Sequence, residues 1–255
     1  MNGGATLAGK RALVTGGGSG VGAVIALALA EEGAAVTIAG RRRRQIEDVA
    51  ARAPASITPV EADVTEEASV AAMFEAAGAP VHIVVANAGA AESAPFAKTD
   101  AALWARMLAV NLTGTFLTFR EALRRMKGSD WGRLIAVAST AGLKGYPYVA
   151  PYCAAKHGVV GLTRALALET ARMGVTVNAL CPGFMETPLL VRSVANIMAK
   201  TGKSEEEARL VLAGTNPMGR FVRPDEVACA VLWLCGPGAD AVTGQAISIS
   251  GGETS

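Results

Sequence analysis

The first regular pattern in the chain is a short apolar strand that runs directly into a glycine-rich loop and then into an apolar helix. The strand covers Arg11–Thr15, and the loop reads Gly16-Gly17-Gly18-Ser19-Gly20-Val21-Gly22. Residues without side chains let the backbone turn sharply and approach a pyrophosphate, which then binds at the helix N-terminus. The strand before and the helix after supply the context that this motif requires. We therefore predict a dinucleotide site that includes Gly16, Gly18, Ser19, Gly20, Val21 and Gly22.

Short β-branched runs alternate with longer helical patterns along the rest of the chain. We expect strands near 11–15, 35–39, 57–62, 81–86, 133–139, 175–181 and 245–249. Helices are expected near 20–32, 42–52, 66–77, 100–127 with one break, 151–173 and 224–236. This alternation predicts an α/β fold over residues 1–255: one Rossmann-type domain with a doubly wound parallel sheet of seven strands in the order 3-2-1-4-5-6-7.

A short helical lid is expected at about residues 184–216, where the alternation fails. Thr187-Pro188 predicts a helix with Thr187 as N-cap, and Ser204 with Glu207 predicts a capping box at a second helix. The apolar residues of this segment either cover an acyl or ring substrate or only pack the lid against the body. They are Phe184, Met185, Leu189, Leu190, Val194, Ile197 and Met198.

The charge balance and composition exclude several classes of protein. The 24 Lys and Arg residues nearly balance the 22 Asp and Glu residues, so nucleic acid is not an expected partner. No apolar run reaches the roughly 18 residues of a membrane span. Met1–Thr6 lacks the charged and apolar regions of a secretory signal. The chain has four cysteines without CxxC spacing and two histidines, so we expect neither disulfides nor a metal site. We expect a cytoplasmic protein.

A run of arginines, Arg41–Arg44, follows the second predicted strand and Gly40. NAD-dependent enzymes carry an acidic residue about 20 residues after the glycines, where it binds the ribose 2′-hydroxyl. Here the first acidic residue is Glu47. Cations at a helix start are disfavoured by the helix dipole, which a bound 2′-phosphate would offset. We therefore predict that Arg41 and Arg42 bind NADP(H), with NAD(H) as the other possible cofactor.

Tyr152 and Lys156 stand four residues apart near a predicted helix start, and Ser139 ends the preceding strand. Residues four apart share a helix face, so the Lys156 ammonium is expected beside the Tyr152 phenol. A nearby cation favours phenolate and would lower the pKa of Tyr152, as a general acid for ketone reduction requires. Ser139 can hydrogen-bond the substrate oxygen. The alternative is a surface pair at the start of a helix.

Taken together, these motifs resemble the single-domain short-chain dehydrogenase/reductases, and the resemblance covers essentially the whole chain. The catalytic tetrad of that family corresponds to Asn111, Ser139, Tyr152 and Lys156. Further cofactor contacts correspond to Asp63 and Val64 at the adenine, to the signature Asn87, Ala88 and Gly89, and to Pro182, Gly183 and Thr187 at the nicotinamide.

The resemblance also implies a mechanism and an assembly. Tyr152 would donate a proton to the carbonyl oxygen, and Ser139 would orient that oxygen. Lys156 would lower the Tyr152 pKa and bind the nicotinamide ribose, and Asn111 would support a proton-relaying water. The hydride would be the 4-pro-S one, and the protein would be a homotetramer.

Two branches of the family resemble this chain most: the 3-oxoacyl thioester reductases with the 3-hydroxyacyl-CoA dehydrogenases, and the aromatic polyketide ketoreductases. After Gly89 the chain reads Ala90-Ala91-Glu92-Ser93, without the Pro-Gly-Gly element of the polyketide enzymes. We expect a 3-oxoacyl thioester substrate, with a secondary alcohol, a cyclic ketone or a polyketide as alternatives. A non-catalytic dinucleotide sensor is the alternative from another class. A CoA or carrier-protein moiety could be bound by Arg124, Arg125, Lys127 and Arg172.

Overall fold

The strands expected from the sequence form one sheet, and each lies beside the predicted neighbours. The structure is a computed structural model that describes residues 7–254, apart from the side chains of Pro188, Leu189 and Arg192. Over this range the sheet is parallel throughout, in the order β3-β2-β1-β4-β5-β6-β7, which confirms the predicted topology. The strands are β1 (Arg11–Thr15), β2 (Ala35–Gly40), β3 (Ile57–Glu61), β4 (Ile83–Ala86), β5 (Gly132–Val137), β6 (Val175–Pro182) and β7 (Ala246–Ile249).

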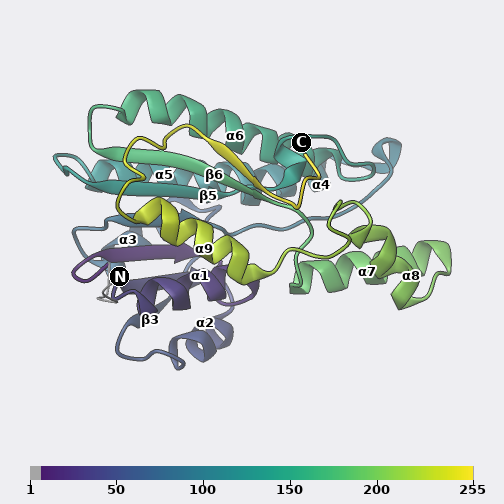
Figure 1. The fold of residues 1–255 in the computed structure, drawn as a ribbon, viewed down its shortest axis with the longest axis horizontal. Coiled ribbons are helices and arrows are strands. Elements are labelled where there is room, and N and C mark those ends of the chain that lie inside the picture. The colour runs from purple at the N-terminus through teal and green to yellow at the C-terminus, as the bar shows by residue number, and fades with distance from the viewer. Residues whose placement is uncertain (1–6, 255) are drawn as a thin grey trace.

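Helices cover both faces of the sheet because alternate residues of each strand point to opposite faces. In β1, Val14 belongs to an apolar cluster with residues of α1 and α9, and Leu13 belongs to a second cluster with residues of α3, α5 and α6. Figure 1 shows α1 and α9 side by side on one face. The helices are α1 (Gly20–Glu31), α2 (Arg43–Ala50), α3 (Glu67–Ala77), α4 (Ala101–Leu108), α5 (Gly114–Arg125), α6 (Ala150–Thr170), α7 (Pro188–Thr201), α8 (Glu205–Ala213) and α9 (Pro224–Cys235).

The predicted break in the helix near 100–127 is a single π-helical turn. Residues Ala109–Thr113 form this turn between α4 and α5. Such turns widen a helix locally and often occur at functional sites. Asn111 lies within it and is fully buried. The break in the regular helix therefore coincides with a predicted catalytic residue, Asn111.

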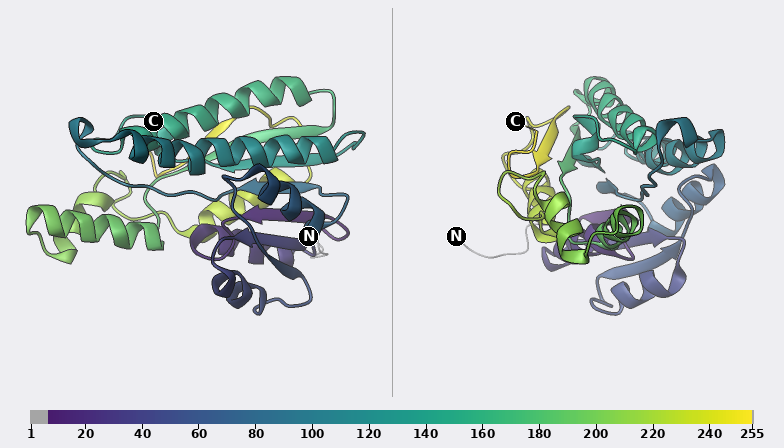
Figure 2. Two further views of the ribbon diagram at one scale, coloured as in Figure 1. Left: turned by 180° about the vertical axis from the view of Figure 1, so that it is seen from behind. Right: turned by 90° about the vertical axis from the view of Figure 1, so that its right-hand side faces the viewer.

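The lid consists of α7 and α8, which project past the end of the sheet (Figure 1; Figure 2 shows the same projection from behind). Ser204 and Glu207 form the predicted capping box at α8. Pro188 opens α7 as predicted, but the Thr187 hydroxyl donates to the Met185 carbonyl (3.3 Å) and does not cap the helix. No helix in residues 7–254 is long and apolar enough to cross a membrane. The expectation about Met1–Thr6 lies outside the described residues.

The apolar residues of the lid pack mainly against one another. Leu190 and Val194 are buried with Ala208 in a separate cluster, and Phe184 and Ile197 pack against it. Met198 is partly exposed, and the Leu189 side chain lies outside the described part of the chain. Packing within the lid therefore accounts for most of this apolar pattern, and it differs from the expected packing of the lid against the body.

Candidate active site

Asn87 fixes the shape of the glycine-rich loop from the end of β4. Its amide Nδ2 donates to the carbonyl oxygens of Thr15 (2.9 Å) and Gly16 (3.2 Å). A Cβ placed on Gly16 would lie 2.8 Å from this nitrogen, and one on Gly22 would lie 2.3 Å from it. Gly16 also has a φ of +68°, a left-handed conformation that favours glycine. Both glycines are thus needed for Asn87 to hold the loop this closely.

The hydroxyl of Thr15 forms the other half of this junction, and Thr15 was not among the predicted site residues. It accepts hydrogen bonds from the backbone N–H groups of Asn87 (3.0 Å) and Ala88 (3.1 Å) and donates to the Val85 carbonyl (3.5 Å). Thr15 is buried at the end of an otherwise apolar strand. A hydroxyl in that position is the sequence signal that could have identified it.

The start of α1 offers donors that fit a pyrophosphate. The first N–H groups of a helix have no partner inside the helix. Ser19 precedes α1 with extended backbone, and its side chain forms no capping hydrogen bond. The backbone at Gly18, Gly20 and Val21 therefore lies where a helix N-terminus binds anions. The donor set of this loop fits the phosphates of a dinucleotide.

The arginines after β2 lie against two other predicted cofactor residues. Arg42 Nη2 donates to Ser19 Oγ at 3.4 Å, so it spans from the end of β2 to the start of α1. Arg41 Nη1 lies 3.7 Å from Asp63 Oδ2, and the Arg41 side chain is 72% exposed. Val64 is buried against the start of α5, where a Cβ on Gly114 would lie 2.7 Å from it. The exposed arginines and Asp63 thus form a polar rim beside the glycine loop.

Asp63 is held in its ionised form. Burial opposes ionisation, but hydrogen bonds from the backbone N–H (2.9 Å) and the hydroxyl (2.8 Å) of Thr65 favour it, and so does Arg41. The net effect is a lowered pKa for Asp63. A carboxylate with one oxygen occupied by Thr65 keeps the other for a cation or an external donor.

Asn111 anchors the loop that follows the Asn87-Ala88-Gly89 signature. Its Nδ2 donates to the carbonyls of Ala90 (2.8 Å) and Met107 (3.0 Å), and its Oδ1 accepts from the Ala90 N–H (3.2 Å). A Cβ on Gly89 would lie 2.7 Å from Asn111 Oδ1 and 3.7 Å from Lys156 Nζ. Asn111 and Lys156 therefore approach the same backbone segment, and glycine is needed there.

Ser139 and Tyr152 meet because a glycine lets the segment after β5 press against α6. Ser139 Oγ accepts from the Ala141 N–H (3.1 Å) and caps the short 3-10 helix Thr140–Gly142. A Cβ on Gly142 would lie 2.7 Å from the Lys156 carbonyl oxygen. The half-buried phenol of Tyr152 then forms a side-chain hydrogen bond with Ser139. Two of the four predicted catalytic side chains are thus joined across this contact.

The expectation that Lys156 lowers the pKa of Tyr152 is wrong for this structure. Burial raises the pKa of Tyr152 to about 12, and the hydrogen bond with Ser139 only partly opposes this. Burial also lowers the pKa of Lys156 to about 8. Lys156 Nζ donates to the Val137 carbonyl at 2.8 Å and lies 5.6 Å from the centroid of the Tyr152 ring. The lysine is near the tyrosine, as the spacing predicted, but it is directed at the strand.

The segment after β6 reaches the same edge of the sheet. Pro182 pairs with Ile249 of β7, and the Gly183 N–H donates to the Ile249 carbonyl (3.1 Å). Thr187 lies just before α7, with its hydroxyl on the Met185 carbonyl. Pro182 and Gly183 are therefore fixed by the last strand, and Thr187 lies at the base of the lid.

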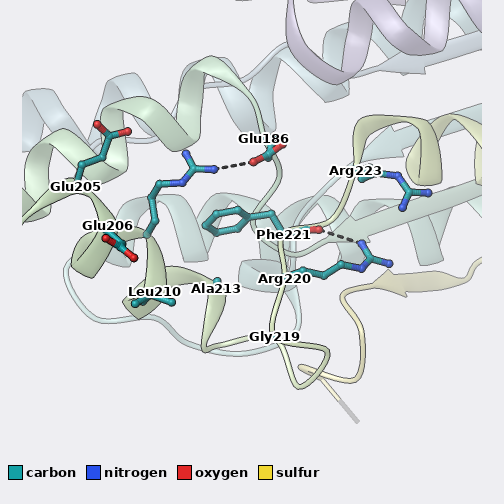
Figure 3. A pocket seen from close by; sticks show the side chains of 10 residues that line it. Glu186, Glu205, Glu206, Leu210, Ala213, Gly219, Arg220, Phe221 and Arg223 are labelled. Carbon is teal, nitrogen blue, oxygen red and sulfur yellow. Dashed lines mark hydrogen bonds and ion pairs between the residues drawn. The ribbon is translucent and has the colours of Figure 1, made fainter.

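A hollow of about 670 Å³ lies beside α8, and none of the predicted catalytic residues lines it (Figure 3). Its three arginines form ion pairs with nearby carboxylates. Arg209 pairs with Glu186 (2.6 Å), Arg220 with Glu226 (2.7 Å) and Arg223 with Asp225 (3.1 Å). These arginines are occupied, and the hollow offers no strong site for an anion.

The basic residues at the helix ends are also partly occupied. Arg125 pairs with Glu75 (2.6 Å) and Glu121 (2.8 Å), and Arg124 lies 3.5 Å from Glu121. Both arginines therefore have partners within the chain. At Arg124 and Arg125, a carrier or CoA phosphates would compete with these ion pairs.

Comparison with known proteins places this site in a family. The family described as enoyl-(acyl carrier protein) reductase matches residues 16–254. A D-beta-hydroxybutyrate dehydrogenase of Rhizobium meliloti is 36% identical over 96% of this chain and 98% of its own length. An actinorhodin polyketide ketoreductase solved with NADPH has a TM-score of 0.90 and 39% identity, covering 96% of this chain and 97% of its own. A 3-ketoacyl-(acyl-carrier-protein) reductase of Brucella melitensis complexed with NADH has a TM-score of 0.89 and 34% identity, covering 98% and 100%.

Proposed function

Because the chain belongs to the short-chain dehydrogenase/reductase family, we propose that this oxidoreductase reduces the ketone of a 3-oxoacyl thioester to the alcohol, or runs the reverse reaction. The observation that carries the proposal is the contact of Tyr152 with Ser139 beside Lys156 and Gly89. It combines a proton donor, a hydroxyl that can orient an oxygen, and a buried cation next to the backbone signature.

In the proposed reduction, Tyr152 gives its phenolic proton to the carbonyl oxygen of the substrate. Burial raises the pKa of Tyr152 to about 12, so the phenol still carries this proton at neutral pH. Ser139 orients the same oxygen and stabilises the charge that develops on it. A bound nicotinamide dinucleotide supplies the hydride to the carbonyl carbon.

In this proposal the remaining site residues bind the cofactor and hold the surrounding loops in place. The glycine-rich loop and the start of α1 hold the pyrophosphate, and Asp63 with Val64 holds the adenine end. Arg41 and Arg42 favour NADP(H) by binding a 2′-phosphate, and NAD(H) is the second candidate. Lys156 binds the nicotinamide ribose, Asn111 fixes the loop at Ala90, and the segment with Pro182, Gly183 and Thr187 contacts the nicotinamide.

The substrate class is argued from what the similar proteins share. Their names describe a hydroxybutyrate, a polyketide and a 3-ketoacyl group on a carrier protein. Two of the three, the hydroxybutyrate and the 3-ketoacyl group, carry oxygen on the β-carbon of a carboxylic acid or acyl chain. A polyketide is the second candidate, favoured by the 39% identity to the actinorhodin enzyme. Against it, Ala90-Ala91 follows Gly89, where the polyketide enzymes carry Pro-Gly-Gly.

Turnover decides among these possibilities. The purified protein should be assayed with acetoacetyl-CoA, a cyclic ketone and a sugar, each with NADPH and with NADH. We expect the highest kcat/KM for acetoacetyl-CoA with NADPH. A higher value for the cyclic ketone would favour a secondary-alcohol or polyketide-type substrate. Cofactor binding without turnover of any carbonyl compound would favour a non-catalytic sensor.

A further inference from the structure

A buried polar cluster joins the C-terminal residues to the segment between β5 and α6. The Tyr146 hydroxyl is hydrogen-bonded to Glu253 Oε1 and, at 2.6 Å, to the hydroxyl of Thr140. A carboxylate can only accept hydrogen bonds, so the Tyr146 hydroxyl donates its hydrogen bond to Glu253. The Thr140 hydroxyl then donates to the phenol oxygen. Lys144 Nζ lies 3.2 Å from Glu253 Oε1. In Figure 1 the C-terminus lies beside the start of α6, where this segment ends.

Glu253 is buried to a degree that is unusual for an acidic side chain. Its side chain has 0% exposure, and its Oε2 has no hydrogen-bond partner among the described residues. This oxygen lies 3.0 Å from the position that a Cβ on Gly183 would occupy. A buried carboxylate oxygen without a donor costs free energy, and an apolar residue could attach the C-terminus at lower cost. Packing alone therefore does not account for a glutamate here.

Tyr146 contacts the residue that follows each of two candidate site residues. Its hydroxyl meets Thr140, which follows Ser139. Its ring lies edge-on to Phe184, which follows Gly183, with 6.2 Å between the ring centroids. Burial and the hydrogen bond to Glu253 raise the pKa of Tyr146. One side chain thus connects the segments of the orienting hydroxyl and the nicotinamide contact.

We propose that Tyr146 and Glu253 are positioning residues for the reaction, through which the C-terminal segment holds Ser139 and Gly183 in register and, through the hydrogen bond with Ser139, also Tyr152. The inference rests on the function proposed above. Lys144 lies beside the Glu253 carboxylate, and the Tyr146 side chain links Glu253 to the segments that carry Ser139 and Gly183. Neither residue belongs to a motif, and neither is one of the proposed catalytic or cofactor residues.

The test compares Glu253→Gln and Tyr146→Phe with two controls from the same segments. Tyr148→Phe removes an exposed tyrosine hydroxyl two residues along, and Thr254→Val removes the hydroxyl next to Glu253, which bonds Ser248. We expect kcat for the ketone to fall about tenfold or more in both test variants, because small misplacements of reacting groups are costly. The KM for NADPH and the melting temperature should change little in Tyr146→Phe, whose ring still packs on Phe184. Both controls should keep the wild-type kcat.

A merely structural role would lower the melting temperature and leave kcat per folded enzyme unchanged. If both test variants keep kcat within about twofold of the wild type, the positioning role is refuted. Amide hydrogen exchange of residues 140–149 gives a readout that needs no turnover. If the wild type reduces no ketone, the proposed function fails, and exchange then decides: faster exchange in Glu253→Gln supports the ordering role, and unchanged exchange overturns it.

Discussion

Lys156 Nζ lies 2.8 Å from the carbonyl oxygen of Val137, the last residue of β5. Lys156 lies one helical turn after Tyr152 on α6. Its hydrogen bond therefore connects α6 to the strand that leads into Ser139. Lys156 is only 4% exposed, so its ammonium is hydrogen-bonded within the protein and removed from solvent. Burial lowers the pKa of Lys156, and a smaller electrostatic effect of Cys181 opposes this.

The first prediction follows from the lowered pKa of Lys156. Between about pH 8 and 10.5, Lys156 is neutral in the folded protein and protonated in the unfolded chain. The unfolded state then binds more protons, so the free energy of unfolding should rise with pH across this window. The rise should be at most about 3 kcal/mol. Urea unfolding gives the free energy of unfolding of the wild type and of Lys156→Met at each pH, and the difference between the two proteins isolates the contribution of Lys156. If this difference stays constant from about pH 8 to 10.5, the prediction is wrong.

The arrangements of residues that the structure reproduces are those that short spacings in the sequence encode. The glycine-rich loop stands between one strand and one helix, and Tyr152 and Lys156 lie four residues apart on one helix. Distances within one helix or one strand-loop-helix unit do not depend on the rest of the fold, so the proximity of these groups could be predicted from the sequence. The strand order followed in the same way from the alternation of short apolar runs and helical patterns.

Properties that depend on distant contacts could not be read from the sequence. The sign of the Tyr152 pKa shift depends on burial and on Val137, which accepts the lysine hydrogen bond, and spacing says nothing about either. The contact between Tyr146 and Glu253 spans 107 positions and belongs to no local pattern. Asn87 was expected to touch the cofactor, yet its amide is occupied by Thr15 and Gly16. Only the packed structure shows that it supports the loop from behind.

The second prediction concerns cofactor choice. If Arg41 and Arg42 bind a 2′-phosphate, the double variant Arg41→Ala/Arg42→Ala should raise the KM for NADPH by roughly ten- to a hundredfold, because charge-assisted phosphate contacts are lost. The KM for NADH should change much less. Arg44→Ala, from the same basic run, is the matched control. Equal changes for both cofactors, or a wild-type preference for NADH, would reverse the assignment.

The third prediction is a homotetramer. Large apolar side chains are exposed on three of the helices that flank the sheet: Leu168 (83%) on α6, Phe116 (42%) on α5 and Trp233 (51%) on α9. The strand β7 lies at an edge of the sheet, and such edges are usually covered. Light scattering at micromolar concentration should give the mass of four chains, and Leu168→Glu should reduce it. Leu210→Glu, on the exposed face of the lid, should leave the mass unchanged. A monomeric wild type would refute the prediction.

The fourth prediction concerns Asn111. Replacing it by alanine leaves the N–H and the carbonyl of Ala90 without their partner, at about 1–3 kcal/mol each. Asn111→Ala should therefore lower the free energy of unfolding by about 2–5 kcal/mol and reduce kcat. Thr118→Val removes a buried hydroxyl that donates to the Gly114 carbonyl and should cost less than about 1 kcal/mol. Similar losses in the two variants would argue against an anchoring role for Asn111.

The last prediction separates the roles of Tyr152 and Lys156. Tyr152→Phe keeps the half-buried ring and removes only the hydroxyl, so the fold and the affinity for the cofactor should survive. Loss of a general acid typically costs about 10²–10⁴ in rate, and kcat should fall by at least that lower value. Lys156→Met should lower kcat and also weaken NADPH binding, measured by fluorescence titration, because the lysine is proposed to hold the ribose. If Tyr152→Phe kept more than roughly a tenth of the wild-type kcat with normal cofactor binding, Tyr152 could not be the proton donor.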